Sequence, residues 1–462
     1  MLVPATILLP IVAGLLLFAL PRDDRRLSRG IGTLVAAATF FMLAFGRGQE
    51  WSYRWLSRPF EAAFHFGATP VSFWLALLLA LCAASAIAAT TVPRSRNFVA
   101  LVLFLEGSML GLFLARDLLV FALFWDLMLI PVFFALAGWS GHPATAWRYF
   151  IYNFAGGLLL LLATAAFGII DGSTDVIGRG GVHIVGAWAP WIFAGFAIAF
   201  LVKTPVWPLH TWMPLTYTDL PAPMAAVVGA VQSKAGLYGL IVVALAFMPE
   251  YLHQYSGLLI VLGAISMVYG AVSALVQHDA KRVVAYSSLS HLGLIVIAIV
   301  SGNQLALQGA LVYMIAHGLF SAALFIIVGY VEERERTRSL MRLGGLGWAN
   351  PRLAGAFCIA CLAALGLPGL AGFAGELVML IGIYQAGYLW PAIVGLVAIV
   401  LASAYFLRLY QGIMNGPALE DLPVRNDLTW IEGLAVAPLL AALVFVGIQP
   451  NAIMAAFAGI VK

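Results

Sequence analysis

Most of the chain consists of apolar runs of about twenty residues, separated by short polar segments. A helix needs about 20 apolar residues to cross a bilayer. Inside the bilayer, backbone polar groups must be satisfied within the protein, which favours helices. Hydrophobic residues make up 63% of the chain and charged residues only 10%, whereas soluble domains have about 25% charged residues. We therefore predict an all-α polytopic membrane protein with about fourteen transmembrane helices.

Two of these runs are interrupted by glycine and proline. The seventh breaks after Lys203 and the twelfth between residues 366 and 369, with Glu376 soon after. Interrupted helices at matching positions indicate repeats with a site near the bilayer midplane. Two proline kinks that only help packing are the alternative. The helix-breaking prolines are Pro205, Pro208 and Pro368.

The paired breaks predict two inverted repeats of five helices each. Residues 1–96 would form the first three transmembrane helices. The first repeat, helices 4–8, would span 97–250, and the second, helices 9–13, would span 251–414. Residues 415–462 would contain helix 14. The polar and aromatic segment 47–69 is expected to be an exposed loop.

Ionisable residues inside the apolar runs are the main functional signal. A charge at the bilayer centre costs about 2.5–3.5 kcal/mol on insertion scales. Lysine occurs at only four positions, and two of these, Lys203 and Lys234, lie within or at the end of apolar runs. Lysine can lose its proton when desolvated, whereas arginine effectively cannot. Asp126, in the fifth run, is the natural partner of Lys203, so this pattern favours proton movement.

Further titratable residues occupy other apolar runs. A hydrated relay would use histidines, which titrate near neutral pH, together with carboxylates. The alternative for each histidine is a hydrogen-bonded core side chain, and Glu106 could instead satisfy a neighbouring helix or a partner subunit. The candidates are Glu106, His291, His317 and Glu376, with His210 and Tyr286 in secondary roles.

Motifs for other chemistry are missing from the sequence. No metal-ligand spacing, nucleophile triad, phosphate-binding loop or G-x-G-x-x-G after a strand pattern occurs. Three cysteines, Cys82, Cys358 and Cys361, are too few for an iron–sulfur cluster, which generally needs four. We expect no cofactor or metal in this chain, and the net charge of +4 does not suggest nucleic acid.

Four segments resemble the antiporter-like subunits of respiratory complex I, of multisubunit Na+/H+ (Mrp) antiporters and of membrane-bound hydrogenases. They are LVKTPVWPLHTWMP at 201–214, KAGLYG at 234–239, KRVVAYSSLSHLG at 281–293 and GLPGLAGFAGE at 366–376. The resemblance extends over nearly the full length. Within the family, Glu376 fits the chain M type of NADH–quinone oxidoreductase, because the L and N types carry lysine there.

The resemblance implies a proton-pumping subunit that is coupled to electron transfer in other subunits. NADH, FMN, iron–sulfur clusters and quinone would be bound by those partners. The membrane partners would be L-type and N-type antiporter-like chains and small membrane chains. Asp126 departs from the family, which usually has glutamate at that position. The resemblance implies that Asp126 and Lys203 form the ion pair of the proton channel and that Lys234 is its central residue. It also implies that His291 and His317 bridge the two halves of the chain. Glu376 would face the exit or the next subunit, and Glu106 would be a secondary carboxylate.

Two other functions remain open at this stage. One is a subunit of an Na+/H+ antiporter or a membrane-bound hydrogenase. The other is a structural membrane scaffold with a vestigial channel. Most basic residues lie in the loops that follow odd-numbered runs. Loops that are rich in lysine and arginine stay in the cytoplasm. We therefore expect a multi-pass protein of the bacterial inner membrane with both termini on the non-cytoplasmic side.

Overall fold

The computed structural model describes residues 2–21, 23–179, 184, 186–416 and 427–455. Within them, twelve helical segments are long and apolar enough to cross a membrane. Three shorter apolar helices lie at residues 189–203, 351–364 and 371–385. The twelve spans and three shorter apolar helices of the described part of the chain are consistent with about fourteen crossings, and they confirm the predicted all-α membrane fold.

The chain divides into two compact units. Unit 1 contains residues 1–84, 91–212 and 231–258. Its elements are α1 (Leu2–Ala19), α2 (Arg25–Phe45), β1 (Glu50–Leu56), β2 (Ala62–Gly67), most of α3 (Pro70–Ala88), α4 (Ser95–Leu114), α5 (Leu118–Leu127), α6 (Leu129–Trp139), α7 (Pro143–Asp171), α8 (Ala189–Lys203), α11 (Ser233–Gly239), η2 (Leu240–Leu245) and α12 (Pro249–Gln254).

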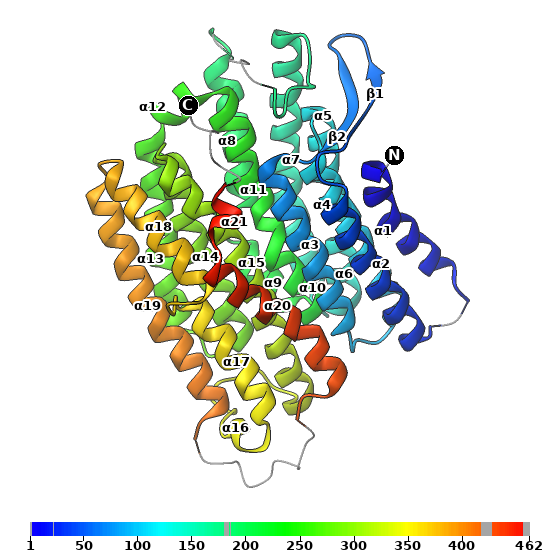
Figure 1. The fold of residues 1–462 in the computed structure, drawn as a ribbon, viewed down its shortest axis with the longest axis vertical. Helices are drawn as coiled ribbons and strands as arrows, with labels where there is room; N and C mark the ends of the chain where they lie inside the picture. The colour runs from blue at the N-terminus through cyan, green and yellow to red at the C-terminus, as the bar shows by residue number, and fades with distance from the viewer. Residues whose placement is uncertain (1, 22, 180–183, 185, 417–426, 456–462) are drawn as a thin grey trace. The chain divides into compact units, whose positions relative to one another are not determined.

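Unit 2 contains residues 85–90, 213–230 and 259–462. Its elements are α9 (Met213–Asp219), α10 (Ala222–Val227), most of η1 (Val228–Gln232), most of α13 (Ser256–Val276), α14 (Ala280–Val300), α15 (Gln304–Glu335), α16 (Leu346–Ala349), α17 (Pro351–Ala364), α18 (Ala371–Gln385), α19 (Leu389–Met414), α20 (Trp430–Ile448) and α21 (Asn451–Met454). The long helix α15 packs against α14, α17, α18 and α20 within this unit (Figure 1).

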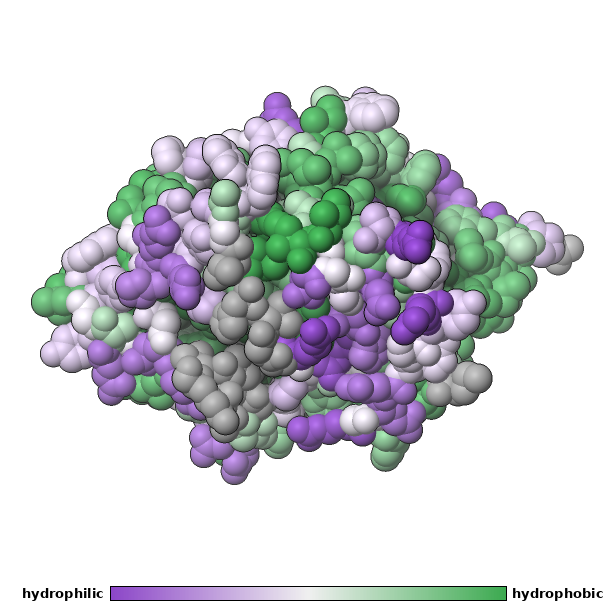
Figure 2. All heavy atoms as spheres, turned by 90° about the horizontal axis from the view of Figure 1, so that it is seen from above, coloured by the Kyte–Doolittle hydropathy of each residue, from purple (hydrophilic) through white to green (hydrophobic). Residues whose placement is uncertain are grey.

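Exposed apolar side chains lie along the lengths of the helices, as expected for helices that face lipid. Leu34, Phe45, Leu162 and Val400 are each more than 60% exposed. On the face that Figure 2 shows from above, hydrophilic side chains lie beside hydrophobic ones. This distribution fits segments that cross a bilayer and end in water. The prediction of two inverted repeats stays a prediction.

The sequence predicts an exposed loop over residues 47–69, and this prediction is wrong. The segment contains an antiparallel hairpin of β1 and β2. Aromatic residues alternate along both strands, so they meet on one face across the pair. The rings of Trp55 and Phe64 lie 4.9 Å apart, and those of Trp51 and Phe66 lie 6.3 Å apart. The second strand is largely buried, because it contacts α4 and α5.

Both predicted helix breaks are present, with one difference. Helix α17 ends at Ala364 and α18 begins at Ala371. Helix α8 ends at Lys203, but residues 204–212 form turns, and helix resumes only at Met213 rather than before Trp212. Two prolines in this segment lack the amide hydrogen that helix continuation needs. The indole of Trp212 donates to the carbonyl oxygen of Val202 at 3.0 Å and so folds the segment back onto α8.

Candidate functional site

Lys203 is the last residue of α8, where the helix dipole favours a cation. The residue is 1% exposed, and its Nζ lies 4.9 Å from the ring centroid of Trp125. This is cation–π geometry, which stabilises a charge that has been removed from water. Pro205, just after the break, is buried, and Pro208 is exposed. His210 follows them and is 5% exposed.

Asp126 is half-buried near the end of α5, next to Trp125. Its carboxylate packs against Gly157 of α7, where an added Cβ would lie 2.8 Å from Asp126 Cγ. Neither Asp126 Oδ1 nor Lys203 Nζ has a hydrogen-bond partner in the described part of the chain. The expected pair therefore makes no direct hydrogen bond here, although the two groups act on each other electrostatically. The lysine instead faces the indole ring, and the aspartate side chain is one methylene shorter than the glutamate that the family usually has.

Lys234 lies on α11 and is completely buried. The π-helical segments η1 and η2 flank α11 on both sides, and such segments are frequent at functional sites. Cys82 of α3 is close enough to interact electrostatically with Lys234. Gly236 brings α11 against the end of α8, because a Cβ there would overlap Thr204. The short α11 thus places Lys234 in the helix that contacts the break.

Glu106 lies on α4 and is also completely buried. Its Oε1 accepts a hydrogen bond of 2.8 Å from the Thr39 hydroxyl of α2. Its Oε2 has no hydrogen-bond partner among the described residues. A carboxylate with one bonded and one open oxygen suits a group that binds and releases a proton.

Unit 2 holds a continuous hydrogen-bonded chain of titratable groups. The Tyr313 hydroxyl on α15 lies 2.5 Å from His291 Nδ1 on α14. The same hydroxyl donates to Glu376 Oε1 on α18 at 2.6 Å. His291 is 4% exposed and Glu376 is 3% exposed. Tyr313 therefore joins a histidine to a carboxylate that lies 85 positions further along the chain (376 − 291).

Other aromatic and histidine side chains extend this chain. The His317 ring centroid lies 5.6 Å from that of His291, and the Tyr405 hydroxyl lies 3.4 Å from His291 Nε2. At the helix break, Gly366 has a positive φ of 81° and leaves room for the Glu376 carboxylate. Pro368 of the same break is exposed. Tyr286 is half-buried on α14 and packs beside the ring of Tyr269.

The sequence reasoning missed three residues that the structure places in these sites. They are Trp125, which faces Lys203, and Tyr313 and Tyr405, which contact His291. A sequence signal existed for Tyr313, which precedes His317 by four residues and so shares its helix face. No signal was available for the other two, because their contacts join separate helices.

Among the described residues, no group of three or more histidine, cysteine or carboxylate side chains could hold a metal ion. Cys82, Cys358 and Cys361 are free thiols. In unit 2, Tyr313 joins His291 to Glu376, and in unit 1, Asp126 and Lys203 interact electrostatically. Such an arrangement can hold and pass protons between neighbouring groups.

Comparison with known proteins identifies the family. Residues 115–402 match the model described as NADH:quinone oxidoreductase/Mrp antiporter, TM. NADH-quinone oxidoreductase subunit M of Pseudomonas aeruginosa is 32% identical over 98% of this chain and 95% of its own length. A chain of respiratory complex I from Thermus thermophilus with bound NADH is 30% identical, with a TM-score of 0.88 and complete coverage of both chains.

A more distant structure shares the fold. A chain of the Mrp complex from Dietzia is 19% identical, with a TM-score of 0.85 over 100% of this chain and 97% of that chain. The family match covers more than half of this chain, and the similarity to the chain M relative extends over nearly all of both proteins. This chain belongs to the family of antiporter-like membrane subunits of NADH:quinone oxidoreductase and Mrp antiporters.

Proposed function

We propose that this chain is the proton-translocating M-type subunit of an NADH–quinone oxidoreductase complex. It would couple electron transfer in other subunits to proton pumping across the bacterial inner membrane. The observation that carries the proposal is the burial of Lys203, Lys234 and Glu376, none of which is more than 3% exposed. Three ionisable groups withdrawn from both water and lipid need a functional reason.

In unit 1, the position of Asp126 would control the charge of Lys203. Two opposite charges 4 Å apart attract by about 4 kcal/mol at an effective dielectric constant of about 20. This energy corresponds to about three orders of magnitude in the protonation equilibrium, at 1.36 kcal/mol per tenfold. Movement of the carboxylate toward Lys203 would load a proton, and movement away would release it toward Lys234.

In unit 2, the tyrosine hydroxyl would carry the proton between histidine and carboxylate. The Tyr313 hydroxyl donates to Glu376 and lies within hydrogen-bond distance of His291. It can receive a proton on one side as it donates on the other. His317 lies beside His291 and would supply the preceding site. Glu376 would pass the proton to the exit or to the next subunit.

The redox chemistry would take place in partner subunits. We propose that NADH, FMN, iron–sulfur clusters and quinone bind there and that this chain holds none of them. Its membrane partners would be L-type and N-type antiporter-like chains and small membrane chains. Both termini would lie on the non-cytoplasmic side, because the basic loops favour the cytoplasm.

A subunit of a cation/proton antiporter or membrane-bound hydrogenase without these redox partners is the second candidate. The family includes Mrp antiporters, and the Dietzia chain shares the fold. The higher identity to complex I subunits favours the first function. A scaffold with a vestigial channel is the candidate from a different class. It gives no reason for two fully or nearly fully buried lysines.

The test is Lys234→Ala in the assembled complex. Inverted membrane vesicles would be given NADH, and both proton uptake and quinone reduction would be followed. We expect proton uptake to be lost and quinone reduction to slow. The control is Lys462→Ala, since this lysine lies outside the apolar runs. Full pumping by Lys234→Ala would refute the relay. Assembly without redox subunits would instead support the antiporter.

A further inference from the structure

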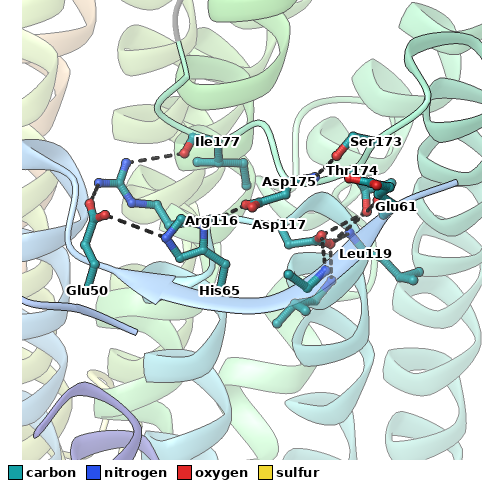
Figure 3. Close-up of polar contacts among 12 residues, drawn as sticks. Glu50, Glu61, His65, Arg116, Asp117, Leu119, Ser173, Thr174, Asp175 and Ile177 are labelled. Atoms are coloured by element: carbon teal, nitrogen blue, oxygen red, sulfur yellow. Dashed lines mark hydrogen bonds and ion pairs between the residues drawn. The ribbon is translucent and has the colours of Figure 1, made fainter. Parts of the chain in front are cut away.

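Four ionisable side chains meet at one end of unit 1, where the hairpin contacts the turn between α4 and α5 (Figure 3). We name Glu50, His65, Arg116 and Asp175 the hairpin cluster. His65 Nδ1 lies 2.7 Å from Asp175 Oδ1, and His65 Nε2 lies 3.7 Å from Glu50 Oε2. Arg116 Nη2 lies 2.5 Å from Glu50 Oε1. The imidazole thus sits between two carboxylates.

The hairpin cluster is anchored but reaches water. The side chains of Glu50 and Asp175 are 51% and 33% exposed, and that of His65 is 22% exposed. The backbone fixes the cluster, because Arg116 N donates to His65 O at 2.8 Å and Ile177 N donates to Arg116 O at 2.8 Å. A fixed and partly exposed imidazole suits the exchange of protons with solvent.

Asp117, next to the cluster, ties the same three segments together. Its carboxylate caps α5 by accepting from Leu119 N at 2.7 Å. It also accepts from Ala63 N of β2 at 3.0 Å and from the Thr174 hydroxyl at 2.9 Å. These bonds hold the hairpin and the segment after α7 on the turn that carries Arg116 (Figure 3).

Polar groups continue from the cluster into unit 1. The charge of Arg116 acts on the buried hydroxyl of Tyr238, which is hydrogen-bonded with Thr69 and Ser72. This hydroxyl also donates to Phe113 O at 3.2 Å. Thr69 and Ser72 bond to each other at the start of α3. A row of hydroxyls therefore lies between the cluster and the interior.

The inner end of this row lies on the helix that carries Lys234. Tyr238 follows Lys234 by four residues on α11. Side chains four residues apart on a helix lie about 5–6 Å apart at Cβ and share a face. Tyr238 therefore lies one helical turn from the central lysine, on the side that leads to the hairpin cluster.

We propose that this row is the proton-release path from Lys234, that His65 is its terminal group, and that Glu376 passes its own proton to the next subunit. A proton leaves Lys234 Nζ, passes along the hydroxyls of Tyr238, Ser72 and Thr69, and reaches the hairpin cluster. It is bound there as the His65 imidazolium between Asp175 and Glu50, and then enters the water. This path rests on the proposed function, because Lys234 must carry the proton that the path releases.

The charges around His65 predict when the proton leaves. The hydrogen bond to Asp175 raises the pKa of His65 above its ordinary value of 6.5, and Glu50 adds to the rise. Burial and the Arg116 charge act in the opposite direction. The imidazolium therefore keeps its proton below pH 6.5 and releases it as the pH rises past its higher pKa. Release should become faster as the pH on the hairpin side rises through that value.

The first experiment removes one hydroxyl from the row. Tyr238→Phe keeps the ring and should lower proton uptake by assembled complex in inverted vesicles by about 10²-fold, the low end for a positioned proton carrier. The matched control is Tyr251→Phe on α12, a half-buried tyrosine of the same unit outside this row, which should pump normally. Normal uptake by assembled Tyr238→Phe would overturn the path.

The second experiment tests the terminal group and does not depend on the first. His65→Gln keeps a polar side chain but cannot titrate. We expect severalfold slower proton uptake at a luminal pH of about 8, and loss of the rise in rate above pH 6.5. Added imidazole should restore uptake, which a purely structural role would not allow. His253→Gln, at an exposed position on α12, is the control and should keep the pH profile.

The two hypotheses fail in different ways. If Lys234→Ala pumps normally, the proposed function is wrong and the path falls with it. If Lys234 is essential but both Tyr238→Phe and His65→Gln retain pumping and the pH profile, only the release path is wrong. If Tyr238→Phe does not assemble, the pH profile and imidazole rescue of His65→Gln decide.

Discussion

Gly157→Ala is the sharpest test of how unit 1 positions its carboxylate. Gly157 is buried in α7 and faces Asp126. A Cβ at this position would lie 2.8 Å from Asp126 Cγ and 3.0 Å from Oδ2, and closer still to Oδ1. Ordinary contact begins at 3.4 Å, so Cγ would have to move by at least 0.6 Å (3.4 − 2.8). The added methyl group therefore displaces the carboxylate.

The energies indicate an effect on function rather than on folding. Alanine gains about 0.5–1 kcal/mol over glycine in a helix, and overpacking costs about 1–3 kcal/mol, so net destabilisation is small. Asp126 and Lys203 act on each other through charge and not through a direct hydrogen bond. An added separation of about 1–2 Å would weaken their attraction by up to about 1 kcal/mol at a dielectric constant of about 20. A loss of about 1 kcal/mol changes the protonation equilibrium of Lys203 about fivefold.

The assay compares proton uptake per NADH oxidised in inverted vesicles that contain equal amounts of assembled complex. We expect Gly157→Ala to pump fewer protons per NADH at normal assembly. The control is Gly355→Ala on α17, where an added Cβ meets no atom within 4 Å. Wild-type pumping by Gly157→Ala would show that the exact place of the Asp126 carboxylate does not matter, and the electrostatic account of Lys203 would be refuted.

Two further predictions concern unit 2 and the hairpin. Tyr313→Phe removes the hydroxyl that bridges His291 and Glu376. Proton uptake should therefore fall while the complex still assembles. Unchanged uptake would contradict the proposed proton transfer in unit 2. The pKa of His65 is raised in the folded protein. The contact between His65 and Asp175 therefore stabilises the hairpin fully below pH 6.5, and this stabilisation is lost as the pH rises through the raised pKa. Hydrogen exchange in the hairpin, corrected for intrinsic rates, should therefore increase above that pH in the wild type but not in His65→Gln.

Much of the architecture was predictable because a membrane allows few choices. Apolar runs of bilayer length must become helices, and clustered proline and glycine predicted the two breaks, one after Lys203 and one before Glu376. The burial of Lys234 was also predictable, since an ionisable residue inside a membrane span is expected to face the protein interior. The hairpin was not foreseen, because a short aromatic segment can equally be a loop.

Contacts between helices could not be read from the chain. The sequence alone determined that Lys203, Lys234 and Glu376 would lie in or beside membrane helices, because hydrophobicity and proline act locally along the chain. Only the tertiary structure decided that Tyr313 joins His291 to Glu376, and that Lys203 packs over the ring of Trp125. Side-chain partners depend on which helices pack together and how each is rotated, and small residues such as Gly157 set those approaches at positions far apart in the chain.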